Sequence, residues 1–144
     1  QPHGGAQRWL VLTDGSENSL RSVRAAIARI ARAKEAPQIH LLNVQHSLPG
    51  TVRGMHVGAE KYHQEEGTKA LAVARKVLDE AGIAHTDHVG VGDAAEVIAR
   101  YVREQGIDEI IMGTRGAGAV ANALMGSVAT RVLQQVDVPV LLVK

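Results

Sequence analysis

The sequence contains no cysteine and no phenylalanine, and it has only one tryptophan and two tyrosines among its 144 residues. Without cysteine, disulfide bonds, thiolate catalysis and zinc sites built from cysteine are excluded. With so few aromatic side chains, the core must be built from Val, Ile, Leu and Ala. Such a core suits strands that are buried on both faces.

The sequence also lacks a strong charge of either sign and a long apolar run. Its formal net charge is +1, whereas proteins that coat nucleic acid usually have a large basic excess. No apolar run approaches the roughly 18 residues that cross a bilayer, and the polar start has no signal-peptide core. We therefore expect a cytoplasmic protein with no nucleic-acid or membrane partner.

Strand and helix patterns alternate along the chain, which is typical of βαβ units and a parallel sheet. Short apolar runs predict five strands, at residues 9–13, 39–44, 83–91, 108–112 and 139–143. Periodicity and breaker residues predict helices at 19–34, 60–81, 94–105 and 127–136, and long loops at 45–59 and 113–126. The prediction is a doubly wound, Rossmann-like α/β fold with a five-stranded parallel sheet in the order 3-2-1-4-5 and helices on both faces. Residues 9–144 are expected to form one domain, preceded by a flexible segment, residues 1–8.

A glycine-rich segment follows the fourth predicted strand, where doubly wound sheets bind ligands. It reads Gly113-Thr114-Arg115-Gly116, then nine residues, then Gly126-Ser127. Glycines let backbone N–H groups approach phosphate oxygens, and Ser127 at an N-cap would lie where a helix favours negative charge. From these residues alone, the segment either binds phosphate or makes a flexible connection with an ordinary helix cap.

The spacing Gly-x2-Gly-x9-Gly-(Ser/Thr) is the nucleotide-binding signature of the ATP-binding branch of universal stress proteins, and the sequence is similar to that family from Trp9 to Lys144. The run from Trp9 to Ser16 resembles the family's first strand and Asp-Gly-Ser turn. Residues 92–98 resemble its Gly-Asp-Pro-Ala-Glu-x-Ile stretch, with Ala94 in place of Pro. Residues 138–143 resemble its closing strand.

The resemblance implies that ATP and Mg²⁺ are the cofactors and assigns a role to each matching residue. The phosphates would be held by Gly113, Gly116, Gly126, Ser127 and Val128. The adenosine part would lie against Leu12, Thr13, Asp14, Val44 and Met112. Leu12 stands where the family often has Pro, and Thr13 where Val is common.

Asp14 and Arg115 each have two interpretations. Asp14 precedes Gly-Ser, as turn and capping residues often do. It also follows the first strand, where a carboxylate can help to hold the Mg²⁺ of a bound triphosphate. Arg115 either binds the β- or γ-phosphate, since a guanidinium matches phosphate geometry, or it is a solvated loop residue.

Seven histidines are scattered along the chain without a His-Glu-x-x-His motif. We therefore expect surface or loop histidines rather than a metal site. His85 and His88 are three residues apart on a predicted strand, so their side chains should point to opposite faces.

Three functions remain open. The first is an ATP-binding regulatory module of the stress response, with little or slow hydrolysis because no dedicated water-activating base is evident. The second is a slow ATPase or adenylate-transferring enzyme on the same fold, and the third is a nucleotide-free, partner-binding stress protein. The resemblance also implies a homodimer formed through the terminal strand at residues 138–143, which would otherwise leave an exposed edge.

Overall fold

The computed structural model describes residues 5–47, 56–114 and 126–144. In these segments the elements are β1 (Arg8–Leu12), α1 (Glu17–Arg32), β2 (Gln38–Gln45), α2 (His56–Glu80), β3 (His85–Val91), α3 (Ala94–Gln105), β4 (Glu109–Gly113), α4 (Ser127–Gln135) and β5 (Val140–Val143). All strand pairs are parallel, and the strand order is β3-β2-β1-β4-β5. The doubly wound fold and the strand order predicted from the sequence are confirmed.

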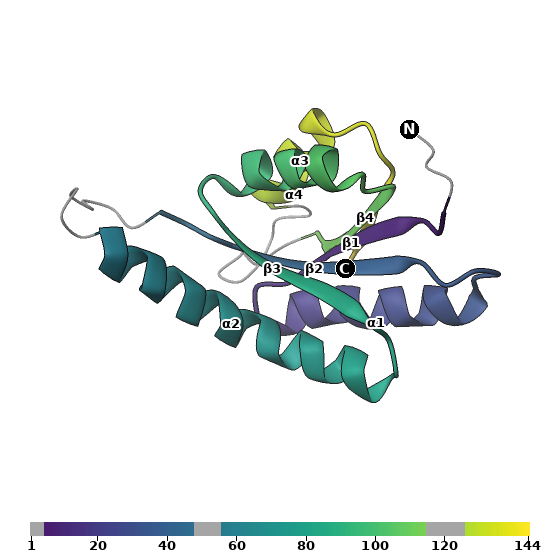
Figure 1. The fold of residues 1–144 in the computed structure, drawn as a ribbon. Coiled ribbons are helices and arrows are strands. Elements are labelled where there is room, and N and C mark those ends of the chain that lie inside the picture. Colours follow the sequence, from purple (N-terminus) through teal and green to yellow (C-terminus); the bar gives the residue numbers. More distant parts are fainter. Residues whose placement is uncertain (1–4, 48–55, 115–125) are drawn as a thin grey trace.

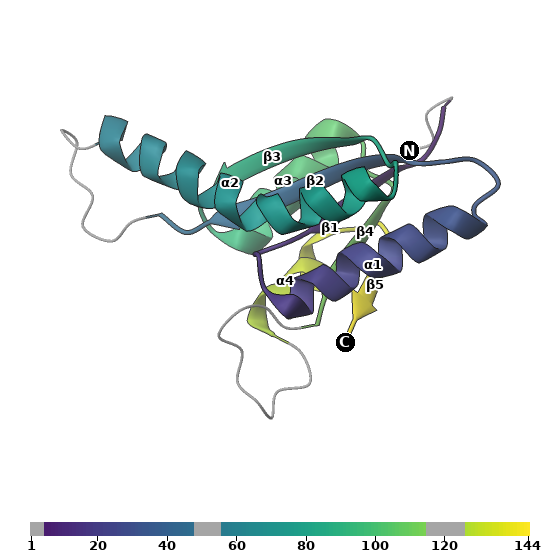
Figure 2. The ribbon, with the colours of Figure 1, turned by 90° about the horizontal axis from the view of Figure 1, so that it is seen from below.

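Helices cover both faces of the sheet (Figure 1). Helices α1 and α2 lie side by side on one face, as the view from below shows (Figure 2), and α3 and α4 cover the other. Alternation along the strands divides the core accordingly. Val11 and Ile111 pack on the α1–α2 side, whereas Leu10 and Ile110 pack on the α3–α4 side, and all four are 0% exposed.

Helix α1 is fixed to the sheet at both ends. Its N-cap is Ser16, whose hydroxyl accepts a hydrogen bond from the N–H of Ser19. Near its C-terminus, the Arg29 guanidinium lies 4.7 Å from the centre of the Trp9 ring and pairs with Glu109. Because Trp9 is in β1 and Glu109 is in β4, this contact holds α1 across the two central strands.

Most element boundaries differ from the prediction by one or more residues, and two of these differences have a clear cause. Strand β1 begins at Arg8, one residue early, because Arg8 is aligned with Gln38 and its N–H donates to Asp108 Oδ2 at 2.8 Å. The loop predicted at 45–59 is too long, since β2 continues to Gln45 and α2 begins at His56. Gly58 therefore lies within α2, because one glycine costs a helix only about 1 kcal/mol and does not end it. None of the described helices has the length and apolar character needed to cross a bilayer.

The histidines are not all at the surface, which corrects that expectation. His40 is 8% exposed and His63 is 5% exposed. His40 Nδ1 lies 2.7 Å from the Tyr101 hydroxyl, and burial, with the nearby charge of Arg8, lowers the pKa of His40. His40 is therefore a core residue that joins β2 to α3.

His85 and His88 point to opposite faces, as predicted. His85 lies between two carboxylates on the α2 side, with Nδ1 2.5 Å from Asp87 Oδ1 and Nε2 2.8 Å from Asp79 Oδ1. The ring of His88 instead lies 5.4 Å from the ring of Tyr101 in α3. Both ring nitrogens of His85 can donate at the same time only when the imidazole is charged.

This arrangement predicts a pH-dependent contribution of His85 to stability. Burial opposes the charge, but the hydrogen bonds and charges of Asp79 and Asp87 outweigh it and raise the pKa of His85 above 6.5. Arg75 also faces the cluster and pairs with Asp87 at 3.0 Å. Because the folded pKa is raised, the stabilisation is complete below the unfolded pKa and is lost as the pH rises through the folded pKa.

The measurement is urea unfolding of the wild type and His85→Gln from about pH 5 to about pH 9. The wild type should be the more stable at acidic pH, and the difference should shrink as the pH rises. His88→Gln, on the opposite face, is the matched control for the loss of an imidazole from β3. A His85→Gln effect that is the same at every pH would refute the prediction.

Candidate functional site

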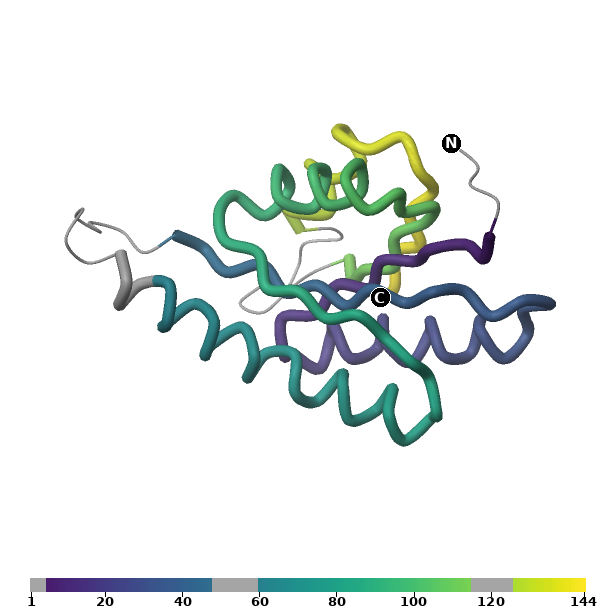
Figure 3. The backbone as a smooth tube through the Cα atoms, in the orientation of Figure 1, coloured from purple at the N-terminus to yellow at the C-terminus, as the bar shows by residue number. Residues whose placement is uncertain are grey.

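A change of direction in the chain occurs at the carboxyl end of β1. Leu12, the last residue of β1, is aligned with Leu42, and β2 continues for three further residues to Gln45. The chain passes from β1 to α1 on one side of the sheet (Figure 3), whereas α4, the helix that follows the neighbouring strand β4, lies on the other side (Figure 1). Connections that leave neighbouring strands on opposite sides open a crevice, which is where doubly wound sheets bind ligands.

Three predicted site residues lie together on the α3–α4 side of this edge. Leu12, Val44 and Met112 all belong to or pack against the same apolar cluster. In the β1–β4 pair the last aligned residues are Val11 and Ile111, and Leu12 and Met112 come directly after them. In the β1–β2 pair Leu12 is aligned with Leu42, and Val44 lies two residues further along β2. The result is an apolar surface from three adjacent strands, in which Met112 is 5% exposed and Leu12 and Val44 are partly buried.

The side chain of Thr13 lies on the α1 side of the sheet, opposite to that of Leu12. Its side chain is 6% exposed and its hydroxyl lies 3.0 Å from the hydroxyl of Ser19 in α1. Its N–H donates to Leu42 O at 3.1 Å, and its carbonyl accepts from Asn43 Nδ2 at 2.8 Å. The structure thus uses Thr13 to hold the turn after β1, on the side opposite to Leu12.

Asp14 makes the contacts expected of a turn and capping residue, which is one of its two interpretations. Its Oδ1 accepts the N–H of Ser16 at 2.9 Å, and its own N–H donates to Ser19 Oγ at 3.2 Å. Gly15 follows with φ +85°, in the left-handed region that favours glycine. Asp14 is also exposed, just beyond the carboxyl end of β1. Within the described segments, no group of three or more His, Asp or Glu residues could hold a metal ion.

Helix α4 begins at Ser127, as predicted, but its N-cap is not the predicted residue. Gly126, not Ser127, is the N-cap, with φ −74° and ψ 164°, and Ser127 is the first helical residue. Both Gly and Ser are favoured N-caps, so the sequence does not choose between them. Among the described residues no side chain caps this helix. The N–H groups of its first turn therefore present the positive end of the helix dipole.

The two ends of the glycine signature meet in space. Gly113 is the last residue of β4 and is aligned with Val143. The N–H of Gly126 donates to the carbonyl of Thr114, which places the start of α4 at the end of β4. Arg115 and Gly116 lie outside the described residues. Val128 is partly buried in the first turn of α4.

Sequence reasoning missed Asn43, which connects β2 to the turn after β1. Asn43 is 2% exposed, donates to the carbonyl of Thr13 and accepts from Gln45 Nε2 at 2.7 Å. An amide residue inside the largely apolar run of residues 39–44 was the available signal, because buried amides are almost always hydrogen-bonded.

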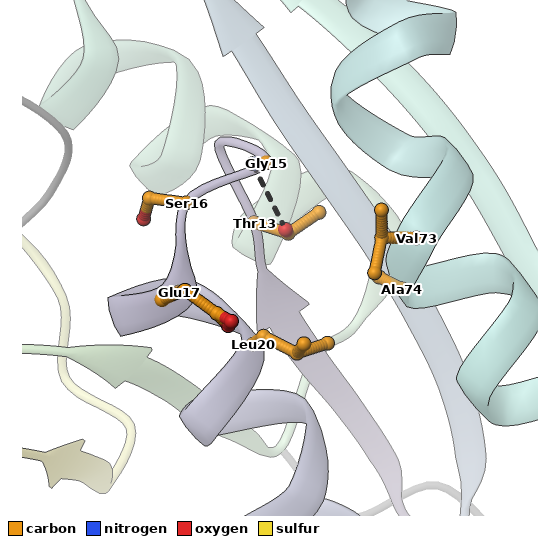
Figure 4. A pocket seen from close by; sticks show the side chains of 7 residues that line it. All are labelled: Thr13, Gly15, Ser16, Glu17, Leu20, Val73 and Ala74. Carbon is orange, nitrogen blue, oxygen red and sulfur yellow. Dashed lines mark hydrogen bonds between the residues drawn. The ribbon is translucent and has the colours of Figure 1, made fainter.

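A pocket of about 270 Å³ lies on the other side of the turn, between the start of α1 and the middle of α2 (Figure 4). The dashed line in Figure 4 is the hydrogen bond from the Gly15 N–H to the Thr13 hydroxyl, at 3.3 Å. The pocket is lined by Thr13, Gly15, Ser16, Glu17, Leu20, Val73 and Ala74. It is therefore separate from the apolar surface of Leu12, Val44 and Met112, which faces α3 and α4.

The site thus combines an apolar surface with an uncapped helix start, at the strand switch of a Rossmann-like α/β sheet. The model of the universal stress protein family matches residues 5–144. The chain belongs to the universal stress protein family, and the resemblance inferred from its motifs is confirmed.

Individual relatives agree with this assignment. Universal stress protein MJ0531 of Methanocaldococcus jannaschii is 31% identical over 140 residues, which cover 96% of this chain and 82% of the relative. The solved structure of MJ0577 from the same organism superposes with a TM-score of 0.84 at 27% identity, covering 96% of this chain and 95% of the other. A universal stress protein in complex with cAMP has a TM-score of 0.69 at 25% identity, with 96% and 97% covered.

Proposed function

We propose that this chain is an ATP-binding regulatory module of the stress response that acts in the cytoplasm. The observation that carries the proposal is the meeting of Gly113, Gly126 and Ser127 around the uncapped N-terminus of α4, beside the apolar surface of Leu12 and Met112. Such a helix start favours phosphate, and an adjacent apolar surface favours a base. The family relative in complex with cAMP supports an adenine nucleotide as the ligand.

Different residues would contact different parts of the nucleotide. The N–H groups of Ser127 and Val128 would receive the phosphates, and the Ser127 hydroxyl would add a donor. Leu12, Val44 and Met112 would receive the adenine. Mg²⁺ would be held mainly by the phosphate oxygens, with Asp14 as its protein-side carboxylate, because Mg²⁺ usually takes one or two carboxylates together with phosphates.

The test is calorimetric titration with ATP and Mg²⁺. Ser127→Ala should weaken ATP binding by about tenfold, since a hydrogen bond to a charged group contributes about 1.5 kcal/mol or more. Gly113→Val should weaken it at least as much, because a side chain there obstructs the approach of phosphate to the backbone. Adenosine, which has no phosphate, should bind both variants as it binds the wild type.

Two variants serve as matched controls. Gly5→Val adds the same side chain where nothing lies within 4 Å. Thr68→Ala removes an exposed hydroxyl on α2 whose partner is the carbonyl of Gln64. Both should bind ATP like the wild type. A folded wild type that binds no ATP would exclude the nucleotide function and favour a nucleotide-free, partner-binding one.

We also propose that two copies pair through β5. This strand is at one edge of the sheet, next to β4, and its residues are only partly buried. An edge strand presents unpaired N–H and C=O groups, which a second copy would satisfy. Sedimentation velocity tests this proposal, and a monomer at high concentration would refute it.

A further inference from the structure

Asp93 and Arg131 form a two-point ion pair that joins the start of α3 to the middle of α4. Arg131 Nη1 donates to Asp93 Oδ1 at 2.7 Å, and Nη2 donates to Oδ2 at 2.8 Å. Asp93 is also the N-cap of α3, where Oδ2 accepts the N–H of Glu96 at 3.1 Å. Because a guanidinium group is rigid and planar, two parallel hydrogen bonds fix both the distance between the two side chains and their relative orientation.

Arg131 lies next to the candidate phosphate site along α4. It is four residues after Ser127, so the two side chains share one side of the helix. Helix α4 has nine residues, and within it only Ala129 and Val132 are buried. Val128 adds a partly buried contact, but these few apolar contacts resist sliding and rotation of a short helix weakly, whereas a two-point ion pair at Arg131 restrains its orientation.

Stability alone does not account for this pair. Both side chains are partly exposed, at 43% for Arg131 and 38% for Asp93, and exposed ion pairs add little to the free energy of unfolding. The hydrogen bond from Arg131, followed by that from the Glu96 N–H, lowers the pKa of Asp93. Asp93 therefore stays ionised, and without Arg131 its negative charge would stand unneutralised at the edge of the sheet where phosphates would bind.

We propose that Asp93 and Arg131 are positioning residues for the phosphate groups of a nucleotide bound at the start of α4. The pair fixes the orientation of α4, so that the N–H groups of Ser127 and Val128 point toward the phosphates. It also neutralises the negative charge of Asp93. Arg131 affects phosphate binding by holding α4 in place. It does not itself bind phosphate, since both of its terminal nitrogens, Nη1 and Nη2, already donate to Asp93. This inference rests on the proposed nucleotide function.

The first test compares the affinities of four variants for ATP and for adenosine. Arg131→Gln, Arg131→Lys and Asp93→Asn should each weaken ATP binding, by about tenfold for Arg131→Gln, and leave adenosine binding unchanged. Asp93→Asn retains the α3 cap, because Asn caps as well as Asp. The double variant Asp93→Asn/Arg131→Gln should be no weaker than Arg131→Gln, since both changes remove one contact. Lys69→Gln, which removes the exposed pair with Glu66 on α2, is the matched control and should have no effect.

A second measurement does not depend on nucleotide. In the ligand-free protein, the hydrogen-bonded backbone amides of Thr130, whose N–H donates to Gly126 O at 3.1 Å, and Val132 should exchange with solvent about tenfold faster in Arg131→Gln than in the wild type, with little change in melting temperature.

Three results would overturn the proposal. They are unchanged ATP affinity in Arg131→Gln, equal losses for ATP and adenosine, and tighter ATP binding in Asp93→Asn, which would make Arg131 a direct phosphate ligand. If the wild type bound no ATP, both proposals would fall, even if amide exchange showed the pair ordering α4. If the wild type bound ATP and Arg131→Gln bound it equally, only this proposal would fall.

Discussion

Asn43→Asp is expected to lower the free energy of unfolding by about 3 kcal/mol or more at neutral pH. The substitution hardly changes the shape of a side chain that is 2% exposed. It replaces the N–H donor that binds Thr13 O at 2.8 Å with an ionised oxygen. A buried carboxylate would then face a carbonyl oxygen, which is both repulsive and poorly solvated. Urea unfolding followed by the fluorescence of Trp9, the single tryptophan, measures the loss.

The pH dependence of this variant separates the lost donor from a general packing defect. A protonated carboxyl group has one O–H and can restore the hydrogen bond to Thr13. Burial raises the folded pKa of the introduced group, so the variant should recover stability as the pH falls through that value. Asn18→Asp, in the first turn of α1, is the matched control and should be neutral or slightly stabilising. An Asn43→Asp variant as stable as the wild type at neutral pH would contradict the role given to Asn43.

The fold could be predicted because each element carried its own signal. Leu10 and Val11 lie in an apolar run too short for a helix, and Gly106 ends α3 with φ 62°, the conformation that favours glycine. The predicted helix ends and caps were wrong where the local sequence does not distinguish between two possibilities. Gly126 and Ser127 are both good N-caps, so only the backbone geometry decides between them. The loop prediction treats Gly58 as a residue that prevents a helix, although a long helix accommodates one glycine.

The candidate site was predictable where it depends on strand alternation and not where it depends on tertiary contacts. Leu12, Val44 and Met112 share a face because neighbouring parallel strands in register align their side chains. The hydroxyl of Thr13 points to Ser19, which no spacing rule reveals, since the contact requires α1 to be docked on the sheet. Asp93 and Arg131 are 38 residues apart and belong to different helices, so their pairing follows only from the packing of α3 against α4.

Gly67→Ala is expected to destabilise the protein by about 1–3 kcal/mol, although Ala is the better helix former. A Cβ atom at Gly67 would lie 2.5 Å from both methyl carbons of Val89. Because the two methyl groups lie on both sides of the added atom, rotating the Val89 side chain does not remove the overlap. Helix α2 would have to move away from β3, loosening the cluster that contains Leu71 and Ala74.

A double-mutant cycle with Val89→Ala tests whether this close contact is the cause. Val89→Ala alone should be destabilising, because it leaves a cavity under α2. Gly67→Ala/Val89→Ala should be more stable than the sum of the single losses by about 1 kcal/mol or more, because the added methyl group occupies the vacated space. Ala72→Gly, at an exposed position of the same helix, measures the propensity difference without the contact. Strictly additive losses, or a stabilising Gly67→Ala, would show that α2 is not held against β3 through the missing side chain of Gly67.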